Sequence, residues 1–462
     1  MRKTYNLVEL FSGIGSQAKA LKNLGINVKL SGTSEWDIHA IVAYDIIHNS
    51  PEIPTEIRNM NKDELLDIMK KYTFSNSGKA PLDYRSFKTY SVDALRHIYV
   101  SVVRNKNFVD ISHLDGTLLP DNIDIMTYSF PCQDLSNVGA FHGYNKGIDK
   151  NSGSRSSLLW QVGRILTEMK YAGKLLPRFL LMENVPTLLS DRHFKNFSTW
   201  ISDLESLGYI SHYYQLNASS FGLPQNRPRL LMISVYVGNC TDTKELVEEY
   251  FKKKNNSEHI IQDFRKSDFF VQNTVQELLR TNYANHNIFQ EAIESTPNDT
   301  ESRRKIWVQN PQIVLPDGTL NPSINTIRTI TTKQDRNPNS GNLYFNSGIE
   351  GRSKFRYLTP RECLLFMGFT DEDYRKLKYN NIEFHKGHTL FSRDKIIRLA
   401  GNSIPVNLLE GVFYQILQID SILSIHLNRT KLPAVVSSSK SNYSDMILSY
   451  VSKSEIRSRL TN

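Results

Sequence analysis

Strand-like apolar runs alternate with helical patterns over residues 5–236, and this alternation restricts the fold more than any other feature. The opening unit has a strand over 5–10, a helix over 19–24 and a second strand from 28 to about 35. Later strands are expected at 123–127, 179–182 and 230–235, with helices at 157–169, 194–207 and 407–419. A further helix is expected to start at Thr359, as N-cap, with Pro360 at its first position. The pattern predicts an α/β fold with a mostly parallel, doubly wound sheet covered by helices.

A second part of the chain, residues 238–350, is rich in Asn, Thr, Lys and Gln and lacks this alternation. The chain of 462 residues is also longer than one hydrophobic core normally uses. We therefore predict a larger domain, residues 1–236 and 397–462, and a smaller irregular domain, residues 237–396. Residues 49–107 are polar with one expected helix over 62–71, and we interpret them as an insertion.

The placement of charge supports this division. Residues 1–300 hold 33 Lys and Arg against 33 Asp and Glu, whereas residues 301–462 hold 23 against 14. The whole net charge of +9 therefore lies in the last third of the chain. Such an excess is typical of a part that binds a polyanion, and a solvated basic surface is the alternative.

Cysteine content and hydropathy limit the metal sites, the disulfides and the cellular compartment to be expected. The three cysteines, Cys132, Cys240 and Cys363, are not closely spaced, and no Cys/His cluster has the spacing of a zinc site. We expect no metal and no disulfide framework, which suits a reducing cytoplasm. No apolar run reaches the ~18 residues of a membrane span, and the N-terminus has no signal-peptide core, so we expect no membrane association.

A glycine pattern, Gly13-x-Gly15-x-x-Ala18, lies directly between the first strand and the first helix. Glycines there let the backbone approach a ligand at the helix N-terminus. Glu35 ends the next strand, where an acid can bind ribose hydroxyls, and Trp36 can lie against an adenine ring. The pattern indicates an adenosine-containing cofactor. A dehydrogenase would share it, and a plain turn is the structural alternative.

Cys132 follows an expected strand, stands between Pro131 and Gln133, and precedes a polar loop. A cysteine in such a place has a fixed position and a sulfur that can react. Buried cysteines are commonly inert, so a core cysteine is the alternative. The flanking residues favour a nucleophile.

Two further groups of polar residues border expected strands. Glu183 and Asn184 follow an apolar run, at the strand end where α/β sheets bind ligands. Arg227 and Arg229 share one face of an extended segment by the two-residue period, and guanidinium groups can bind a ring carbonyl or a phosphate. A helix-capping acid and ordinary surface charge are the respective alternatives.

The order and content of these segments resemble those of the bacterial DNA (cytosine-5) methyltransferases, over roughly residues 5–236 and 355–420. The stretches 128–136 and 152–160 are most similar to the CG-methylating enzymes of mollicutes. The sequence departs from the family at Ser16, where a second glycine is usual, and its acid before the catalytic strand is best matched by Asp110-Ile111. The matching segments are Phe11-Ser12-Gly13-Ile14-Gly15, Glu35-Trp36, Phe130-Pro131-Cys132-Gln133, Glu183-Asn184-Val185, Gln225-Asn226-Arg227-Pro228-Arg229 and Gly401-Asn402-Ser403, with Arg361-Glu362 on the helix that supports the recognition domain.

The resemblance implies a Rossmann-like methyltransferase sheet, S-adenosylmethionine as methyl donor, and a DNA-recognition domain in residues 237–396. Cys132 would attack C6 of a cytosine, Glu183 would protonate N3 or hydrogen-bond to it, and Arg229 would hold O2. Asn184 would help to fix the ring, Arg227 would brace the loop, and Gln133 follows the nucleophile. The resemblance places these residues at the cofactor: Phe11, Ser12, Gly13, Ile14, Gly15, Glu35, Trp36, Asp110, Ile111, Pro131, Asn402 and Ser403.

The implied partner is double-stranded DNA, from which the cytosine must be flipped out. We expect a monomer, held near the nucleoid through DNA. The resemblance leaves open a restriction–modification system, with a separate cognate restriction endonuclease, or a solitary methylase. Candidate DNA contacts, chosen by location, are Arg303, Arg304, Lys305, Arg328, Lys333 and Arg336.

Three other interpretations stay open. A tRNA cytosine-5 methyltransferase could share the fold, although the Cys-Phe-Thr tripeptide of the eukaryotic-type enzymes is missing. An inactive, DNA-binding relative would usually lack the cysteine or the glutamate. A nicotinamide oxidoreductase would leave Cys132, Gln133 and the two arginines without a role.

Overall fold

The structure is a computed structural model that describes residues 3–50, 52–131, 155–334 and 338–431. Its centre is a six-stranded sheet with the strand order β2-β1-β3-β4-β7-β5. The first four strands in this order are parallel to one another, and β7 is antiparallel to both β4 and β5. The prediction of a mostly parallel α/β sheet is confirmed. The strands are β1 (Thr4–Leu10), β2 (Asn27–Ser34), β3 (Ile125–Tyr128), β4 (Phe179–Asn184), β5 (Tyr209–Asn217), which the sequence pattern did not single out, and β7 (Pro228–Tyr236).

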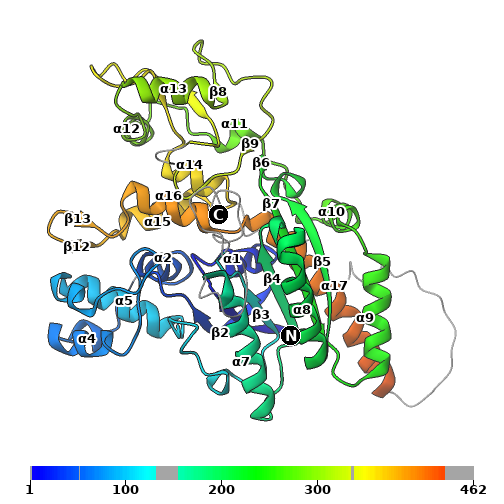
Figure 1. Ribbon diagram of the computed structural model, residues 1–462. Coiled ribbons are helices and arrows are strands. Elements are labelled where there is room, and N and C mark those ends of the chain that lie inside the picture. The colour runs from blue at the N-terminus through cyan, green and yellow to red at the C-terminus, as the bar shows by residue number, and fades with distance from the viewer. Residues whose placement is uncertain (1–2, 51, 132–154, 335–337, 432–462) are drawn as a thin grey trace.

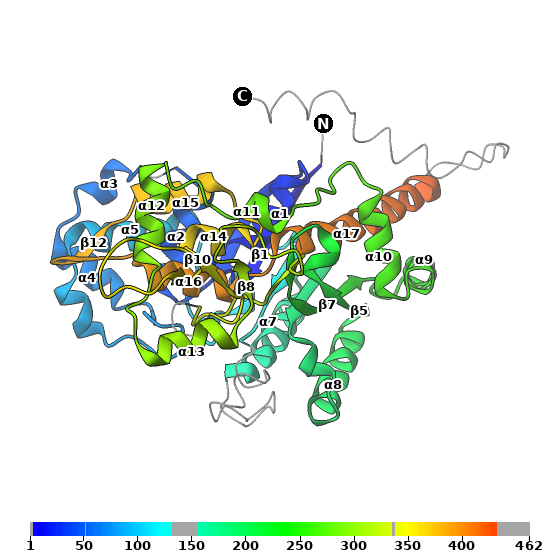
Figure 2. The same cartoon turned by 90° about the horizontal axis from the view of Figure 1, so that it is seen from above.

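Helices cover both faces of the sheet (Figures 1 and 2). Alternate residues of one strand enter different cores: Leu231 and Ile233 of β7 pack in one, and Leu230 and Met232 in the other. This is the two-residue period of a strand buried on both sides. One face carries α1 (Ser16–Asn23), α2 (Ile38–His48) and α17 (Val406–Lys431), and the other carries α7 (Leu159–Tyr171) and α8 (Asp191–Leu207).

Helix α17 corrects two expectations. It is longer than the predicted helix over 407–419, and with the preceding helix it includes a stretch long and apolar enough for a membrane span. Most of that stretch is buried inside the protein, where α17 packs against α1 and two helices beside β5. Its apolar character is therefore that of a core helix. The two helices beside it are α9 (Thr241–Lys253) and α10 (Ser257–Arg265).

The segment 49–107 contains more helix than the one stretch predicted at 62–71. Helix α5 (Val92–Arg104) packs on α2 through Leu95, Ile98 and Val102, which lie on one face at helical spacing and are buried. After α5, Asn107 forms a parallel bridge with Thr33 at the end of β2. The insertion thus forms an extra layer beside the β2 edge. Its helical segments are α3 (Thr55–Arg58), α4 (Lys62–Met69), η1 (Tyr84–Thr89) and α5 (Val92–Arg104).

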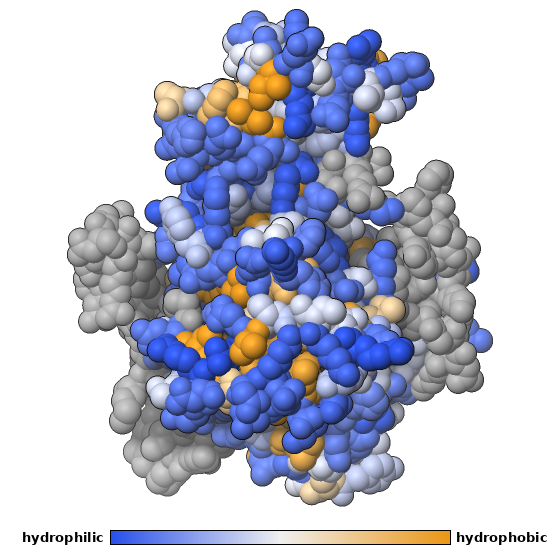
Figure 3. Space-filling view, turned by 90° about the vertical axis from the view of Figure 1, so that its left-hand side faces the viewer, coloured by the Kyte–Doolittle hydropathy of each residue, from blue (hydrophilic) through white to orange (hydrophobic). Residues whose placement is uncertain are grey.

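An upper lobe, which we define as residues 275–356, stands above the sheet (Figure 1). In Figure 3 a narrower section separates this lobe from the rest, and hydrophilic residues cover most of that face. β9 leaves the lobe to pair with β6, next to β7. The elements are α11 (Val275–Leu278), α12 (His286–Glu294), α13 (Glu301–Gln309), β8 (Gln312–Val314), β9 (Ile327–Arg328), β10 (Asn342–Tyr344) and β11 (Phe355–Arg356), with β6 at Gln225–Asn226.

Three helices lie between the lobe and the sheet layer. α14 begins with Thr359 as N-cap and Pro360 in the first turn, as the sequence predicts. α14 packs on α16, and α15 and α16 contact α2. The predicted domain division at residues 237 and 396 stays a prediction. Helices α9, α10 and α14–α16 nevertheless pack on the layer that contains the six-stranded sheet and its covering helices. The elements are α14 (Pro360–Leu365), α15 (Asp371–Tyr379), β12 (Glu383–His385), β13 (His388–Thr389) and α16 (Arg393–Asn402).

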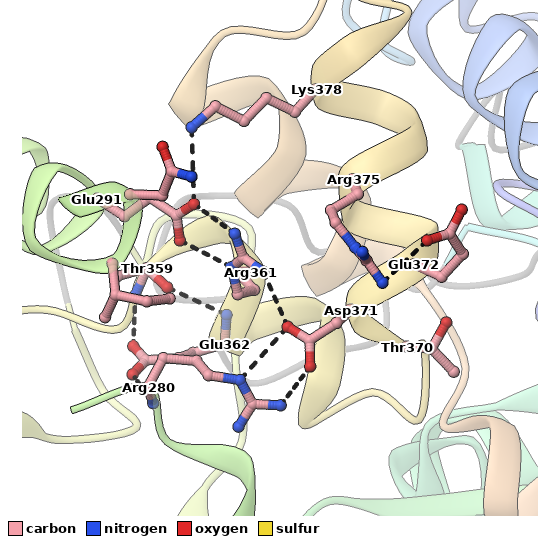
Figure 4. Close-up of polar contacts among 12 residues, drawn as sticks. Arg280, Glu291, Thr359, Arg361, Glu362, Thr370, Asp371, Glu372, Arg375 and Lys378 are labelled. Atoms are coloured by element: carbon pink, nitrogen blue, oxygen red, sulfur yellow. Dashed lines mark hydrogen bonds and ion pairs between the residues drawn. The ribbon is translucent and has the colours of Figure 1, made fainter. Parts of the chain in front are cut away.

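A network of charged side chains joins the lobe to these helices (Figure 4). Arg361 of α14 lies 2.7 Å from Glu291 of α12 and 2.9 Å from Asp371 at the start of α15. Arg280 also pairs with Asp371 at 2.5 Å. The two arginines lower the pKa of the Asp371 carboxyl against the opposing effect of burial. The network gives the lobe a defined attachment, because a partly buried charge is stable only with its partners in place.

Candidate active site at the carboxyl ends of the strands

The carboxyl ends of β1, β3 and β4 meet at one edge of the sheet, because these strands are parallel. The chain runs from β1 to β2 on one side and later returns to β3 on the other. In doubly wound sheets such a reversal is where ligands bind. Every catalytic or cofactor residue predicted from β1 to β4 that the structure describes comes from this edge or from the loops beside it.

The loop after β1 has an uncommon backbone. Phe11 has a φ of 59°, Gly13 of 55° and Gly15 of 80°, all in the left-handed region. A Cβ on Gly15 would lie 2.3 Å from Nε2 of His48 and 2.7 Å from Cε2 of Tyr44, so only glycine fits there. A Cβ on Gly13 would meet nothing within 4 Å among the described atoms. The loop therefore rests against α2 at Gly15 and has open space at Gly13.

Glu35 joins this loop to the end of β2. Its Oε2 accepts a hydrogen bond from the Gly13 N–H at 3.0 Å, and its Oε1 accepts from the N–H groups of Trp36 and Asp37 at 3.0 and 2.9 Å. Burial, with a smaller contribution from the charge of Asp37, raises the pKa of Glu35 to about 7. Glu35 thus stands beside the glycine loop, where the sequence predicts a ribose-binding acid.

Asn107 positions Glu35 and was missed by the sequence reasoning. Its Oδ1 accepts from the Glu35 N–H at 3.0 Å, and its Nδ2 donates to the Glu35 carbonyl at 2.9 Å. The partners are 72 residues apart, so no local pattern could have indicated the contact. The same segment carries Asp110, whose side chain accepts from the Ser112 N–H and pairs with His113, and the buried Ile111.

Glu9, the second-last residue of β1, was also missed. Its side chain is fully buried, accepts from the Ala18 N–H at 3.2 Å, and accepts a short hydrogen bond from the Tyr44 hydroxyl. Burial raises the pKa of Glu9 to about 7. The signal was an acid inside an otherwise apolar strand, between Val8 and Leu10. Glu9 links β1, α1 and α2 beneath the glycine loop.

At the end of β4 an acid and an arginine form an ion pair. Arg229 Nε lies 2.8 Å from Glu183 Oε1, and the Ser129 hydroxyl donates to Glu183 Oε2 at 2.5 Å. Asn184 Nδ2 donates to the Phe130 carbonyl at 3.1 Å. Both Glu183 and Asn184 are buried. The pair therefore lies one strand away from the end of β3, which leads into Pro131.

Pro131 is the last described residue before the predicted nucleophile. The Ser156 hydroxyl donates to its carbonyl at 2.6 Å, which ties this point to the start of α7. Cys132 and Gln133 lie outside the described residues. Ser129 and Ser156 were not predicted, because a serine beside a strand carries no distinctive pattern.

Arg227 serves a different purpose from Arg229. It is 2% exposed, and its guanidinium donates to the carbonyls of Ile330, Gly401 and Ser403 at 2.7 to 2.8 Å. It thus joins the link between β6 and β7 to the upper lobe and to the end of α16. Beside it Asn402 is exposed, and Ser403 is buried with its hydroxyl donating to the Leu399 carbonyl.

The predicted DNA contacts come from the upper lobe. Arg328 and Lys333 are exposed near the β6–β9 pair, and Arg303 is partly exposed on α13. Arg304 and Lys305 are exposed and pair with acids of their own segment, at 2.9 Å each. Arg336 lies outside the described residues.

The sheet, the glycine loop and the acid–arginine pair at its edge are those of an α/β enzyme. The family model for C-5 cytosine-specific DNA methylase matches residues 87–418. The chain belongs to this family, so the resemblance drawn from the sequence is confirmed.

Two relatives match nearly their whole length. The type II methyltransferase M2.ScrFI of Lactococcus lactis subsp. cremoris is 32% identical over 88% of this chain and 98% of that protein. The orphan methyltransferase M.SssI of Spiroplasma monobiae is 30% identical over 90% of this chain and 97% of that protein. The crystal structure of the S. pombe Dnmt2 methyltransferase covers 90% of this chain and 99% of its own, with 14% identity and a TM-score of 0.50. That likeness concerns the fold alone.

Proposed function

We propose that this protein transfers a methyl group from S-adenosylmethionine to C5 of a cytosine in a short target sequence of duplex DNA. Membership of the C-5 cytosine DNA methylase family supports the reaction class. The observation that carries the proposal is the Glu183–Arg229 pair at 2.8 Å, buried beside the strand that leads to Pro131 and the predicted nucleophile. A carboxyl group that carries a proton and a guanidinium side by side can donate to two neighbouring acceptors such as N3 and O2 of cytosine.

The residues at the glycine loop fit the proposed cofactor. S-adenosylmethionine supplies an electrophilic methyl group when bound. Gly13 faces open space, Glu35 offers a carboxylate next to it, and Phe11 and Trp36 are partly exposed beside it. Glu35 would exchange its bond with the Gly13 N–H for ribose hydroxyls, and the two aromatic residues would pack against the cofactor.

The proposed chemistry starts at Cys132. Its thiolate adds to C6 of the ring, which makes C5 nucleophilic enough to accept the methyl group. Glu183 protonates or hydrogen-bonds N3, Arg229 holds O2, and Asn184 fixes the end of β4 through the Phe130 carbonyl. Loss of the C5 proton then allows the thiolate to leave. Arg227 acts as a brace between the upper lobe and α16.

The reaction requires the cytosine outside the duplex, at a cost of a few kcal/mol in lost stacking and pairing. We propose that the predicted recognition domain, residues 237–396, binds the duplex, with phosphate contacts for affinity and base contacts for sequence choice. A cognate restriction endonuclease in the host would make the protein part of a restriction–modification system, and a host without one would make it a solitary methylase. The target sequence would follow from bisulfite sequencing of a plasmid from cells that express it.

A covalent trap tests the proposal. Duplex DNA with 5-fluorocytosine at the target should become covalently bound to the wild-type protein in the presence of S-adenosylmethionine. Cys132→Ser should bind DNA without forming the adduct. A wild-type protein that methylates no duplex DNA, or that labels tRNA alone, would contradict the proposal.

A further inference from the structure

A polar cavity of about 490 Å³ lies between the upper lobe and the start of α16. Three arginines from three separate segments line it: Arg303 from α13, Arg352 from the turn before β11, and Arg393 at the first residue of α16. Hydroxyl groups complete the wall, from Ser295, Thr296, Thr300, Ser302 and Tyr357. The cavity opens to solvent, because Thr300, Ser302 and Arg352 are exposed.

Arg393 has unused hydrogen-bonding capacity. Its Nη2 is buried and has no hydrogen-bond partner among the described residues. Its Nε is 3.5 Å from the Ser295 hydroxyl and its Nη1 is 3.4 Å from the Asp394 carboxylate, so both of those contacts are long. A buried guanidinium N–H without an acceptor is costly, and an anion in the cavity would supply one.

The other two arginines are held in position by their neighbours. Arg303 Nη1 donates to the Tyr357 hydroxyl at 2.9 Å, and Arg352 Nη1 donates to the Thr296 carbonyl at 2.8 Å. The Thr296 carbonyl is neutral, so this contact does not compensate the charge of Arg352. Glu294 is the acid that lines the cavity, and Asp299 nearby is paired with Arg304 at 2.9 Å. Positive charge therefore exceeds negative charge in the cavity.

We propose that this cavity, the arginine pocket, binds a phosphodiester group of the DNA backbone. The proposal rests on the proposed function and adds a docking point for its substrate. Guanidinium groups bind phosphate oxygens in forked geometry, and phosphate contacts fix the register of a protein on a duplex. The excess of basic residues lies in the same third of the chain.

The position of α16 connects the arginine pocket to the active site. The helix has ten residues, so its ends are about 15 Å apart. Arg393 is at one end, and the carbonyls of Gly401 and Ser403, which Arg227 binds, are at the other. Helix α16 thus runs from the arginine pocket to the carbonyls that the Arg227 guanidinium binds, two residues before Arg229 of β7.

Equilibrium binding to a mixed-sequence 30-base-pair duplex tests the pocket. Arg352→Gln and Arg393→Gln should each weaken binding on the order of 10-fold at low salt and make the slope of log K against log salt shallower by about 1. Lys252→Gln, an exposed charge on α9 at the far side of the molecule (Figures 1 and 2), is the matched control and should change neither. Thermal unfolding of each variant shows whether the fold is kept, and Arg352 is exposed, so its replacement leaves the core intact.

The remaining arms separate the possible sources of the anion. Wild-type DNA affinity and slope in both arginine variants would overturn the pocket while methyl transfer, and so the proposed function, still stood. The pocket proposal would also be overturned if the two arginine variants lost binding to inorganic phosphate or to tRNA while their affinity for duplex DNA stayed unchanged. A wild-type protein that depends on the pocket for duplex binding yet never methylates would contradict the proposed function and support the pocket.

Discussion

Arg229 and Glu183 are diagonal neighbours on the antiparallel strands β7 and β4, with Nε 2.8 Å from Oε1. Leu231 is the residue directly opposite Glu183, two positions beyond Arg229. Residues at this diagonal share one face and long side chains can meet. The pair is 46 residues apart in sequence, and only the pairing of the two strands brings it together.

Replacing Arg229 with alanine should lower the rate of methyl transfer by about 100-fold, the typical effect of removing one group that stabilises developing charge. The loss comes from the substrate carbonyl contact and from release of Glu183. Single-turnover transfer of labelled methyl groups measures it, with calorimetric binding of S-adenosylmethionine as the control. An unchanged rate would remove Arg229 from the catalytic set.

Replacing Arg227 with alanine should instead reduce the free energy of unfolding by on the order of 3 kcal/mol, because three buried carbonyls lose a charged donor. Urea unfolding of the variant measures this loss. Arg229→Ala provides the comparison and should lose less stability, since it leaves one buried group, Glu183, without its charged partner, and Glu183 keeps the hydrogen bond from Ser129. Equal stability losses in the two variants would contradict the different roles.

The two glycines of the glycine loop after β1 should respond differently to alanine. Gly13→Ala should cost ~1 kcal/mol of stability for its positive φ alone, as nothing lies within 4 Å of the new Cβ. Gly15→Ala should cost more and weaken cofactor binding, since the Cβ would lie 2.3 Å from His48 Nε2. Chemical unfolding and cofactor titration of both variants check this order.

Stability should depend on the charge state of Glu9. Its pKa is about 7 in the folded protein and near 4.5 when unfolded, so the folded state binds more protons between those values. The free energy of unfolding therefore falls as pH rises through this window. Glu9→Gln should reduce the difference between pH 5.5 and pH 8 by ~2 kcal/mol.

Urea unfolding at the two pH values measures this difference. The variant should keep some pH dependence, because burial also raises the pKa values of Glu35 and Glu410 to about 7. An unchanged pH profile would show that Glu9 is not the carboxyl responsible.

Local sequence determined the elements that short-range physics controls. The period of apolar residues predicted β1, β3, β4, β7 and their helices, and the Thr359–Pro360 pair predicted the start of α14. β5 was missed because tyrosine and histidine blur its alternation, and α5 was missed because its apolar face lies within a polar segment. The glycines after β1 and the acid after β2 predicted the glycine loop and Glu35. These predictions were possible because each depends only on a residue type and its place just after a strand.

Contacts between distant segments were decided by the tertiary structure. Asn107 reaches Glu35 across 72 residues, and Arg227 reaches Gly401 across 174. A guanidinium pattern shows that a charge exists, but its partner depends on which strands and helices become neighbours. The chain alone therefore determined the class of chemistry, through residue types at strand ends. Packing alone decided that Arg229 pairs with Glu183, that Arg227 joins the upper lobe to the end of α16, and that three arginines from separate segments line one cavity.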